Sequence, residues 1–372
     1  MQAAFKTQKT IFMRLTKKNI THYLLDKGFL EPTSFMSGEY MLTQTQSRNS
    51  IFKIQQQQDK GLFVKQLIAQ DATNSYLMQK DATSHYLIHQ SDLYKETATH
   101  IPEYYGYDPY HNILVTEYFA NTKNIHEVVY RDKKLSESHA VKMAHILASF
   151  HFDITKEIKN NSSLQFFSKQ IPWILNTNQL LNNNSQSINN AVIAEIHKHQ
   201  DLVKRMDKVA SQWETSSLIH GDIKWMNFIV MPNNEEVKLI DWEIADLGDP
   251  LWDVAGVFQS YFCAWVLSFN NQNIQDHQQM PGTEFLSVET ITPVVKLLWE
   301  TYASAQKFTA TEAREKLLKT LSYMAARMIQ TAFENNMAQQ QQMYPNSARI
   351  LQFCNHILAD VEGIAKQWNL ID

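Results

Sequence analysis

Apolar and polar positions in the first third of the chain predict a small antiparallel sheet. Short apolar stretches bounded by polar turns occur at 40–45, 51–55 and 61–67, and a fourth, 112–119, runs into a polar junction. The stretch 61–67 carries a lysine, Lys65, near its middle. We therefore expect a sheet whose third strand presents a cation.

Helical spacing of apolar residues dominates the rest of the chain. Residues 138–151 place apolar side chains at helical intervals, and three later amphipathic stretches cover 288–305, 311–337 and 348–368. The chain therefore combines a sheet-forming first third with a mainly helical remainder.

A strand and a hairpin are predicted in the middle of the chain. The three apolar stretches are 217–219, 228–231 and 237–240, and Pro-Asn-Asn at 232–234 forms the turn of the hairpin. Because the two ends of a hairpin meet, its register should return Asp241, directly after the last strand, close to Asn227, directly before the hairpin.

The residues around this hairpin have the chemistry of a phosphoryl-transfer site. Residues 220–227 read His-Gly-Asp-Ile-Lys-Trp-Met-Asn, and Asp241 lies in Leu-Ile-Asp-Trp. Phosphoryl transfer needs one carboxylate to orient and deprotonate the attacking hydroxyl, and hard oxygen ligands to hold Mg²⁺ against the phosphates. Asp222 is the expected base, and Asn227 and Asp241 are the expected metal ligands.

These motifs resemble those of the aminoglycoside phosphotransferase and choline kinase family, small-molecule kinases built on the protein-kinase fold. In that family His-Gly-Asp is followed by four residues and Asn, and the metal-binding Asp lies in Ile-Asp-Trp or Ile-Asp-Phe. The segment 248–255, Gly-Asp-Pro-Leu-Trp-Asp-Val-Ala, resembles the family's Gly-Asp-Pro segment that leads into a large buried helix. The resemblance implies that His220 braces the metal-binding turn and that Asp253 holds the backbone of the catalytic loop.

The same resemblance implies the fold and the reaction. We expect an α+β, bilobal protein-kinase-like fold, with a small N-terminal lobe built on an antiparallel sheet and a larger, mainly helical C-terminal lobe. The expected limits are 1–115 for the ATP-clamping lobe, 116–120 for the hinge and 121–372 for the catalytic and acceptor-binding lobe. ATP and Mg²⁺ are the implied cofactors, and the acceptor is a hydroxyl of an aminoglycoside-, choline- or sugar-like small molecule.

Lys65 is the expected phosphate clamp, paired with a carboxylate on the next helix. Asp81 is the candidate, where the family usually has Glu, and Asp shortens the reach by one methylene. The sequence around Asp81 is echoed ten residues earlier around Asp71, but ten residues rotate a helix by about 280°, so both carboxylates cannot face Lys65. Asp71 is expected in the connecting loop or first turn. A solvated strand charge is the alternative for Lys65.

Further nucleotide contacts are expected in the first lobe and at the hinge. The tip between the first two strands lacks a glycine-rich motif, and backbone amides and small side chains of Ser47, Asn49 and Ser50 are expected to contact phosphate. Adenine is expected to hydrogen-bond to the backbone at Glu117 and Tyr118.

Two alternatives to a small-molecule kinase remain open. Lys224, expected near the γ-phosphate, also occurs two residues after the catalytic Asp in serine/threonine protein kinases, but the short interval 241–250 has no Ala-Pro-Glu segment or long activation loop. A catalytically silent nucleotide-binding module is disfavoured by the intact Asp222, Asn227 and Asp241. The acceptor and the oligomeric state are not specified by the sequence.

Composition fits a cytoplasmic enzyme. A chain of 372 residues with 44% hydrophobic content can fill two lobes, and a net charge of −4 argues against a nucleic-acid partner. Cys263 and Cys354 lie in apolar helical contexts and are expected to be reduced core residues. The most apolar stretch, 253–269, is shorter than the ~20 residues of a membrane span, so no membrane association is expected. Four aromatic residues of the second lobe are open between core packing and acceptor binding: Trp173, Trp213, Trp299 and Tyr302.

Overall fold

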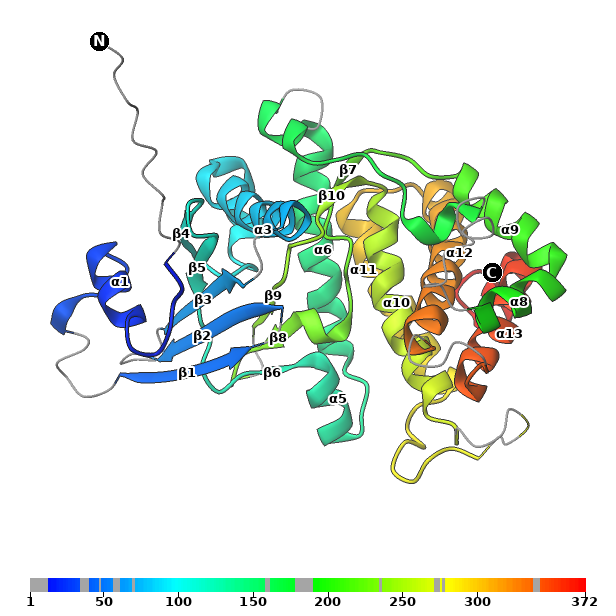
Figure 1. Ribbon diagram of the computed structural model, residues 1–372. Helices are drawn as coiled ribbons and strands as arrows, with labels where there is room; N and C mark the ends of the chain where they lie inside the picture. Colours follow the sequence, from blue (N-terminus) through cyan, green and yellow to red (C-terminus); the bar gives the residue numbers. More distant parts are fainter. Residues whose placement is uncertain are drawn as a thin grey trace, which may run out of the picture. The chain divides into compact units, whose positions relative to one another are not determined.

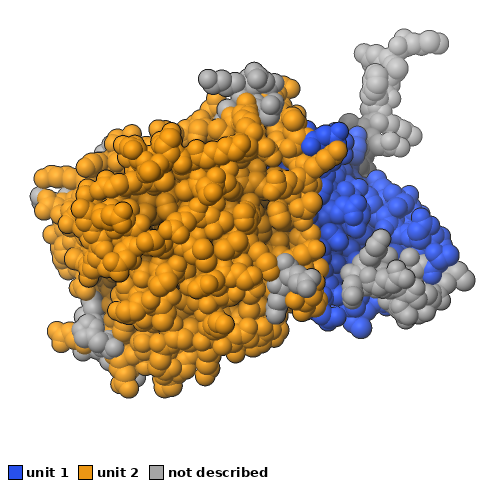
Figure 2. Space-filling view, turned by 180° about the vertical axis from the view of Figure 1, so that it is seen from behind, with its two compact units in different colours: residues 1–92, 101–121 blue, residues 93–100, 122–372 orange. Residues whose placement is uncertain are grey.

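The chain divides into two compact units, shown in different colours in Figure 2. Unit 1 contains Met1–Asp92 and Ile101–Asn121, and unit 2 contains Leu93–His100 and Thr122–Asp372. In the computed structural model the described residues are 13–33, 40–46, 48–55, 61–68, 71–157, 161–177, 190–233, 236–270, 275, 278–336 and 342–372.

Unit 1 is built on a five-stranded antiparallel sheet with strand order β1-β2-β3-β5-β4 (Figure 1). The strands are β1 (Met41–Gln46), β2 (Asn49–Gln55), β3 (Gly61–Leu67), β4 (Tyr104–Asp108) and β5 (Ile113–Glu117). The short helix α1 (Ile20–Asp26) shares a buried apolar cluster with Leu62 and Val64 of β3. Because side chains alternate along a strand, Lys65 and Leu67 point to the opposite face.

Helix α3 (Ala72–Gln90) covers that opposite face of the sheet, where its Met78 and Ala82 pack with Leu67. Asp71 is the N-cap, and its carboxylate accepts a hydrogen bond from Asn74 N at 2.9 Å. The expectation that Asp71 stands at the start of the helix is therefore confirmed. The register of β3 and the position of α3 bring Lys65 and the middle of the helix to the same side of the sheet.

Unit 2 is mainly helical, with α10 packed against α6, α11, α12 and α13 (Figure 1). Its α-helices are α4 (Lys95–Ala98), α5 (Ile125–Asp132), α6 (Glu137–Glu157), α8 (Asn190–Lys198), α9 (Gln200–Ser211), α10 (Pro250–Leu267), α11 (Val288–Ala305), α12 (Ala310–Asn335), α13 (Pro345–Ala359) and α14 (Val361–Gln367). Segment 93–100 joins this unit: Thr97 Oγ1 donates to Ser149 Oγ, and Leu239 N donates to His100 O.

Two small sheets of unit 2 carry the loops of interest. One contains β6 (Lys123–Asn124), β8 (Phe228–Val230) and β9 (Val237–Leu239), and the other pairs β7 (Ser217–Ile219) with β10 (Asp246–Gly248). The predicted strand and hairpin of the central region are thus confirmed, and so is the α+β combination of an antiparallel sheet unit with a mainly helical unit.

The last predicted helix, 348–368, is wrong as a single element. It is two helices, α13 and α14, separated at Asp360, which has φ −151° and ψ 76°. Asp360 cannot continue α13 with these angles, and its carboxylate accepts a hydrogen bond from Gly363 N at 2.9 Å, which starts α14. Apolar spacing runs through both helices, so the pattern alone does not reveal the break.

The structure shows where the two cysteines, the most apolar helices and the aromatic candidates lie. Cys263 and Cys354 are free and buried, and burial raises the pKa of the Cys263 thiol to about 12. Among the described residues no helix combines the length and apolarity of a membrane span. Of the four aromatic candidates, Trp299 and Tyr302 are core residues, whereas Trp173 is 45% exposed.

Candidate active site

The segment 220–227 forms a tight loop between β7 and β8. Gly221 has φ +82°, and a Cβ atom built there would lie 2.9 Å from Ile244 O, so glycine is required by both conformation and space. The loop ends in a single 3₁₀ turn, Trp225–Asn227, that passes directly into β8. This geometry explains the glycine of the His-Gly-Asp motif, because glycine permits the sharp turn that places Asp222 at the tip of the loop.

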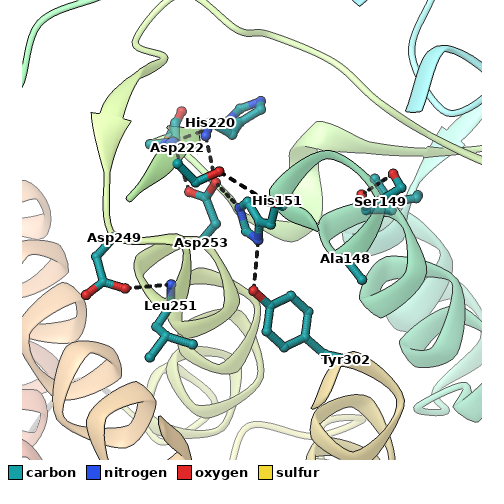
Figure 3. A network of polar contacts seen from close by, with 12 residues as sticks. Ala148, Ser149, His151, His220, Asp222, Asp249, Leu251, Asp253 and Tyr302 are labelled. Atoms are coloured by element: carbon teal, nitrogen blue, oxygen red, sulfur yellow. Dashed lines mark hydrogen bonds and ion pairs between the residues drawn. The ribbon is translucent and has the colours of Figure 1, made fainter. Parts of the chain in front are cut away.

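Asp253, in the first turn of α10, holds the entrance of this loop (Figure 3). Its Oδ2 accepts from His220 N at 2.6 Å and its Oδ1 accepts from Gly221 N at 2.9 Å. His151 Nε2 lies 3.3 Å from the same Oδ2, and His151 Nδ1 lies 3.1 Å from Tyr302 Oη. All of these contacts agree with the bracing role implied for Asp253.

The surroundings of Asp253 favour its ionised form despite complete burial. Burial raises the pKa of this carboxyl, but the hydrogen bond and charge of His151 and the hydrogen bond from the backbone of His220 outweigh that effect, and the pKa falls below its ordinary value. A carboxylate that accepts two backbone amides and a histidine fixes the loop more firmly than a neutral acid would, because charge-assisted hydrogen bonds are stronger.

His220 connects the loop to the strand that precedes Asp241. Its Nε2 donates to Ile240 O at 2.9 Å, and its Nδ1 accepts from Asp222 N at 3.3 Å. This hydrogen-bond pattern assigns the neutral tautomer with the proton on Nε2. The fully buried imidazole packs beside Trp242, with ring centroids 4.8 Å apart. His220 is therefore a structural link between the loop and the turn at Asp241.

Asp222, Lys224 and Asn227 come together at the tip of the loop. The side chain of Asp222 is 33% exposed, and its Oδ2 lies 2.6 Å from Lys224 Nζ. Asn227 Nδ2 donates to Asp222 O at 2.8 Å. The amide nitrogen of Asn227 is thereby used to stabilise the loop, which leaves its Oδ1 as the atom of this side chain suited to a cation.

The hairpin brings Asp241 beside Asn227 in the backbone, as its register predicted. Phe228 pairs with Leu239, and Ile240 N donates to Asn227 O at 3.0 Å, which continues the pairing to the residue before Asp241. Asp241 has φ +73°, a left-handed conformation that is unfavourable for a residue with a Cβ. One carboxylate and one amide oxygen at adjoining positions are the hard oxygen donors that suit a divalent cation.

Asp249, the acid of the Gly-Asp-Pro segment, joins α10 to α12. Its Oδ1 caps α10 by accepting from Leu251 N at 3.0 Å, and its Oδ2 accepts from Tyr323 Oη at 2.9 Å. Lys319 Nζ lies 2.7 Å from the same oxygen. Pro250 occupies the first turn of α10, where a missing N–H costs nothing.

In unit 1 the structure pairs Lys65 with Asp81. Lys65 Nζ lies 2.9 Å from Asp81 Oδ2, with 8% and 6% of the two side chains exposed. His85 lies one helical turn further along α3, and its Nε2 is 3.7 Å from Asp81 Oδ1. Burial lowers the pKa of His85 to about 4, although the charge of Asp81 opposes this shift. Lys65 is thus a buried, paired cation and not a solvated strand charge.

The other predicted nucleotide contacts lie differently from expectation. Asn49 and Ser50 are the first residues of β2 and are 6% and 1% exposed, so they do not form a loop tip. Ser50 pairs with Gln46 of β1, and Asn49 pairs with Leu67 of β3, so both residues belong to the sheet. Ser47 lies outside the described residues. At the expected hinge, Glu117 N donates to Glu103 O and Tyr118 N donates to Gly61 O. Both amides are therefore engaged in backbone hydrogen bonds at the ends of strands of the sheet.

Sequence reasoning missed two buried side chains next to these sites. Arg327 of α12 donates to the carbonyl oxygens of Gly221 and Ile223, on either side of Asp222. His85 lies against Asp81 as described above. A lone arginine within the apolar run 324–329 was the available signal for Arg327, because a cation is buried only where it has partners. The signal for His85 was its position four residues after Asp81 on a helix.

Comparisons with known proteins were made for both sequence and structure. A model of the phosphotransferase enzyme family, APH, matches residues 83–286, more than half of the chain. No protein of curated function matches the chain in sequence.

Three solved structures illustrate the shared fold. A choline kinase from Cryptosporidium parvum Iowa II has a TM-score of 0.57 and 12% identity, with coverage of 94% of this chain and 98% of that chain. A choline/ethanolamine kinase family protein from Mesorhizobium loti has a TM-score of 0.50 and 11% identity, with coverage of 93% and 97%. An ethanolamine kinase from Plasmodium vivax has a TM-score of 0.50 and 12% identity, with coverage of 97% and 93%.

At these identities the structural similarity establishes the fold alone, and it confirms the expected bilobal, protein-kinase-like fold. The extended match to the family model carries the assignment further. It includes the loop 220–227, the turn at Asp241 and the Gly-Asp-Pro segment. The chain belongs to the APH phosphotransferase enzyme family.

Proposed function

We propose that this phosphotransferase is an ATP- and Mg²⁺-dependent kinase that transfers the γ-phosphoryl group to a hydroxyl of a small molecule. The observation that carries the proposal is the loop 220–227. The start of its backbone is held by the buried Asp253, while the side chain of Asp222 at its tip remains one-third exposed beside Lys224 and Asn227. Phosphoryl transfer depends on such a positioned carboxylate more than on covalent chemistry.

Asp222 is assigned as the base that orients the acceptor hydroxyl and takes its proton. Lys224, 2.6 Å from this carboxylate, supplies a positive charge that can move between Asp222 and the transferring phosphoryl group. A lysine suits this task because its ammonium is a compact charge on a flexible stem. Asp222 and Lys224 are therefore the proposed catalytic residues.

Asn227 and Asp241 are the proposed metal ligands. When bound, Mg²⁺ would neutralise the charge of the nucleotide phosphates. The donor set fits a hard dication, since Asn227 uses its amide nitrogen within the loop and retains Oδ1, and since Asp241 follows immediately after the hairpin. The left-handed backbone of Asp241 is the kind of strain that proteins retain at functional positions.

We assign nucleotide binding to the first lobe, within the proposed limits 1–115, and to the proposed hinge 116–120. Lys65 is the phosphate clamp, and Asp81 orients it through the 2.9 Å ion pair. Near the hinge, the carbonyl oxygens of Glu117 and Tyr118 replace the engaged amides as the proposed adenine contacts. Ser47, Asn49 and Ser50 stay candidates for phosphate contact, with Asn49 and Ser50 buried at the start of β2.

The acceptor is proposed to be a choline-, ethanolamine-, aminoglycoside- or sugar-like alcohol. Support comes from the family and from the printed activities of structures with the same fold, which include choline, ethanolamine and amicoumacin kinases. We assign catalysis and acceptor binding to the proposed lobe 121–372. We place the reaction in the cytoplasm, where ATP is available.

The test is an acceptor screen with an independent measurement of nucleotide binding. Purified protein is incubated with ATP, Mg²⁺ and panels of amino alcohols, sugars and aminoglycosides, and ADP release and the phosphorylated product are measured. Asp222→Asn is the matched control, since it preserves size and removes the base. Acceptor-dependent ADP release by the natural protein alone supports the proposal. Absence of Mg²⁺-dependent ATP binding in calorimetry would overturn it regardless of which acceptors were tried.

A further inference from the structure

Arg327 is a buried arginine in the middle of α12, outside the segment that the family model matches. Only 6% of the residue is exposed, and its guanidinium lies 4.9 Å from the ring centroid of Trp252. A cation at such a site requires compensating partners, because burying an isolated charge is costly. The identity of those partners indicates what the arginine does.

The guanidinium binds the catalytic loop on both sides of Asp222. Nη1 donates to Gly221 O at 3.1 Å, and Nη2 donates to Ile223 O at 2.9 Å. These are the carbonyl groups of the residues immediately before and after the proposed base. The planar fork of arginine can reach two such acceptors at once, which a lysine ammonium, with all its donors on one atom, does less well.

The arginine is itself held in position by α10. Its Nε donates to Gln259 Oε1 at 2.8 Å, and Gln259 Nε2 donates to Arg327 O at 3.1 Å and to Thr331 Oγ1 at 2.6 Å. Three donor groups of the guanidinium therefore have defined acceptors. The side chain of Arg327 thus connects α12 with α10 and with the loop 220–227 through hydrogen bonds from all three guanidinium nitrogens.

Gly256 of α10 keeps the space in which this contact forms. A Cβ atom built on Gly256 would lie 2.5 Å from Ile223 O and 3.0 Å from Arg327 Nη2. The absence of a side chain here lets the loop approach α10 closely enough for Arg327 to reach it. Gly256, Ile223 O and the guanidinium of Arg327 thus lie together in one close contact.

Asp253 and Arg327 hold complementary groups of one short segment. Asp253 accepts from the N–H groups of His220 and Gly221, whereas Arg327 donates to the carbonyl groups of Gly221 and Ile223. Arg327 therefore contacts the peptide group that precedes Asp222 and the one that follows Ile223, while Asn227 Nδ2 donates to Asp222 O in the peptide group between them. Gly221 is held through its nitrogen and its oxygen. A residue between two restrained peptide groups has a restrained backbone direction.

We propose that Arg327 is a positioning residue that sets the orientation of Asp222 by clamping the carbonyl groups of Gly221 and Ile223. The assignment of the affected step rests on the proposed kinase function, whereas the clamp itself does not. A displacement of about 1 Å in a catalytic group can cost on the order of 10²-fold in rate, so loss of the clamp should appear in kcat.

The experiment compares Arg327→Lys with Arg205→Lys. Arg205 is the matched control, because its Nη1 also joins two helices of unit 2 by donating to Asn355 O and Oδ1, away from the loop. We expect Arg327→Lys to lower kcat about 10²-fold with KM for ATP changed less than about threefold. Arg205→Lys should leave both constants near those of the natural protein. Equal kcat losses in both variants would show a general effect on helix packing and overturn the proposal.

Amide hydrogen exchange separates the clamp from the kinase assignment. Peptides covering 220–227 should exchange faster in Arg327→Lys than in the natural protein, while peptides from α6 and α11 should not. Unchanged protection of 220–227 overturns the proposal whatever the activity. Faster exchange in a chain that turns over no ATP with any acceptor supports the clamp and removes the proposed function.

A milder variant guards against loss of folding. Gln259→Leu removes the acceptor of Arg327 Nε but keeps the guanidinium and its charge. We expect an intermediate loss in kcat and intermediate exchange of 220–227. If Arg327→Lys does not fold and Gln259→Leu behaves as the natural protein in both measurements, the proposal is wrong.

Discussion

Lys65 and Asp81 are sixteen positions apart, and Lys65 Nζ lies 2.9 Å from Asp81 Oδ2 at a site where both side chains are almost fully buried. The shorter aspartate therefore reaches the lysine, so the missing methylene does not prevent pairing. Removal of one partner would take this ion pair away from the other buried charge, which is more costly than replacing the pair as a whole.

Asp81→Ala should consequently weaken nucleotide use, whereas Asp71→Ala should not. Asp71 caps the start of α3 and has no part in the ion pair, so its loss should lower helix stability only modestly. KM for ATP and unfolding by urea are measured for both variants. Asp81→Glu should not improve the enzyme, because the ion pair is already formed and an extra methylene at a buried position costs about 1–3 kcal/mol. A stronger effect of Asp71→Ala on KM would contradict the assignment.

Asp222→Asn should lower kcat by about 10²- to 10⁴-fold while ATP binding stays nearly intact, because only the proton acceptor is removed. Lys224→Met is the informative companion, since it removes the cation 2.6 Å from Asp222 but leaves the base. Steady-state kinetics and calorimetry are the measurements. Normal turnover by Asp222→Asn with an acceptor identified in the screen would refute the role of this residue.

Asp241→Ala and Asp241→Gly should both abolish the Mg²⁺-dependent tightening of ATP binding, because each removes the carboxylate. They should differ in stability. Glycine tolerates φ +73°, so Asp241→Gly should be more stable than Asp241→Ala by about 1 kcal/mol. Calorimetry with and without Mg²⁺ tests the first part, and urea unfolding tests the second. Retained metal dependence in either variant would exclude Asp241 as a ligand.

His85 should make the protein acid-sensitive. Burial lowers its pKa to about 4 from an ordinary 6.5, with Lys65 and His89 adding to the lowering and Asp81 opposing it. The unfolded chain therefore binds a proton at higher pH than the folded chain, so stability is lost as pH falls from 6.5 toward 4. The loss is a few kcal/mol at about 1.4 kcal/mol per pKa unit.

The free energy of unfolding is measured at about pH 7.5, 6, 5 and 4.5, which covers the range in which the unfolded chain takes up a proton on His85 before the folded chain does. His85→Leu should flatten this dependence, and His126→Gln, at an exposed position of α5, is the control that should not. Parallel curves for the natural protein and His85→Leu would show that His85 does not titrate in this window.

Local patterns were sufficient to predict the hairpin and its consequences. The turn predicted at 232–234 implied a register that returns Asp241 to Asn227, and the pairing of Phe228 with Leu239 confirms that register. These predictions succeeded because both ends of each contact lie within a few residues of a turn. The same holds for Asp71, whose role as a cap depends on the next three residues.

Other features depend on partners that are distant in sequence. Arg327 reaches a loop more than one hundred positions earlier, and no periodicity within α12 identifies the two carbonyl groups that it binds. The burial of Asn49 and Ser50 follows from pairing with neighbouring strands, which extends the ladder into the expected turn. The break at Asp360 depends on a single residue's dihedral angles within continuous apolar spacing.

The two buried cysteines give the chain a practical property. Cys263 and Cys354 are its only cysteines, both are buried, and burial raises the pKa of both thiols, so neither presents a reactive thiolate to solvent. A cysteine introduced at Tyr110, 80% exposed in unit 1, and another at Met280, 45% exposed in unit 2, would then be the sites that accept maleimide dyes. Fluorescence energy transfer between such dyes would follow the separation of the two units through nucleotide binding and turnover without prior removal of native thiols.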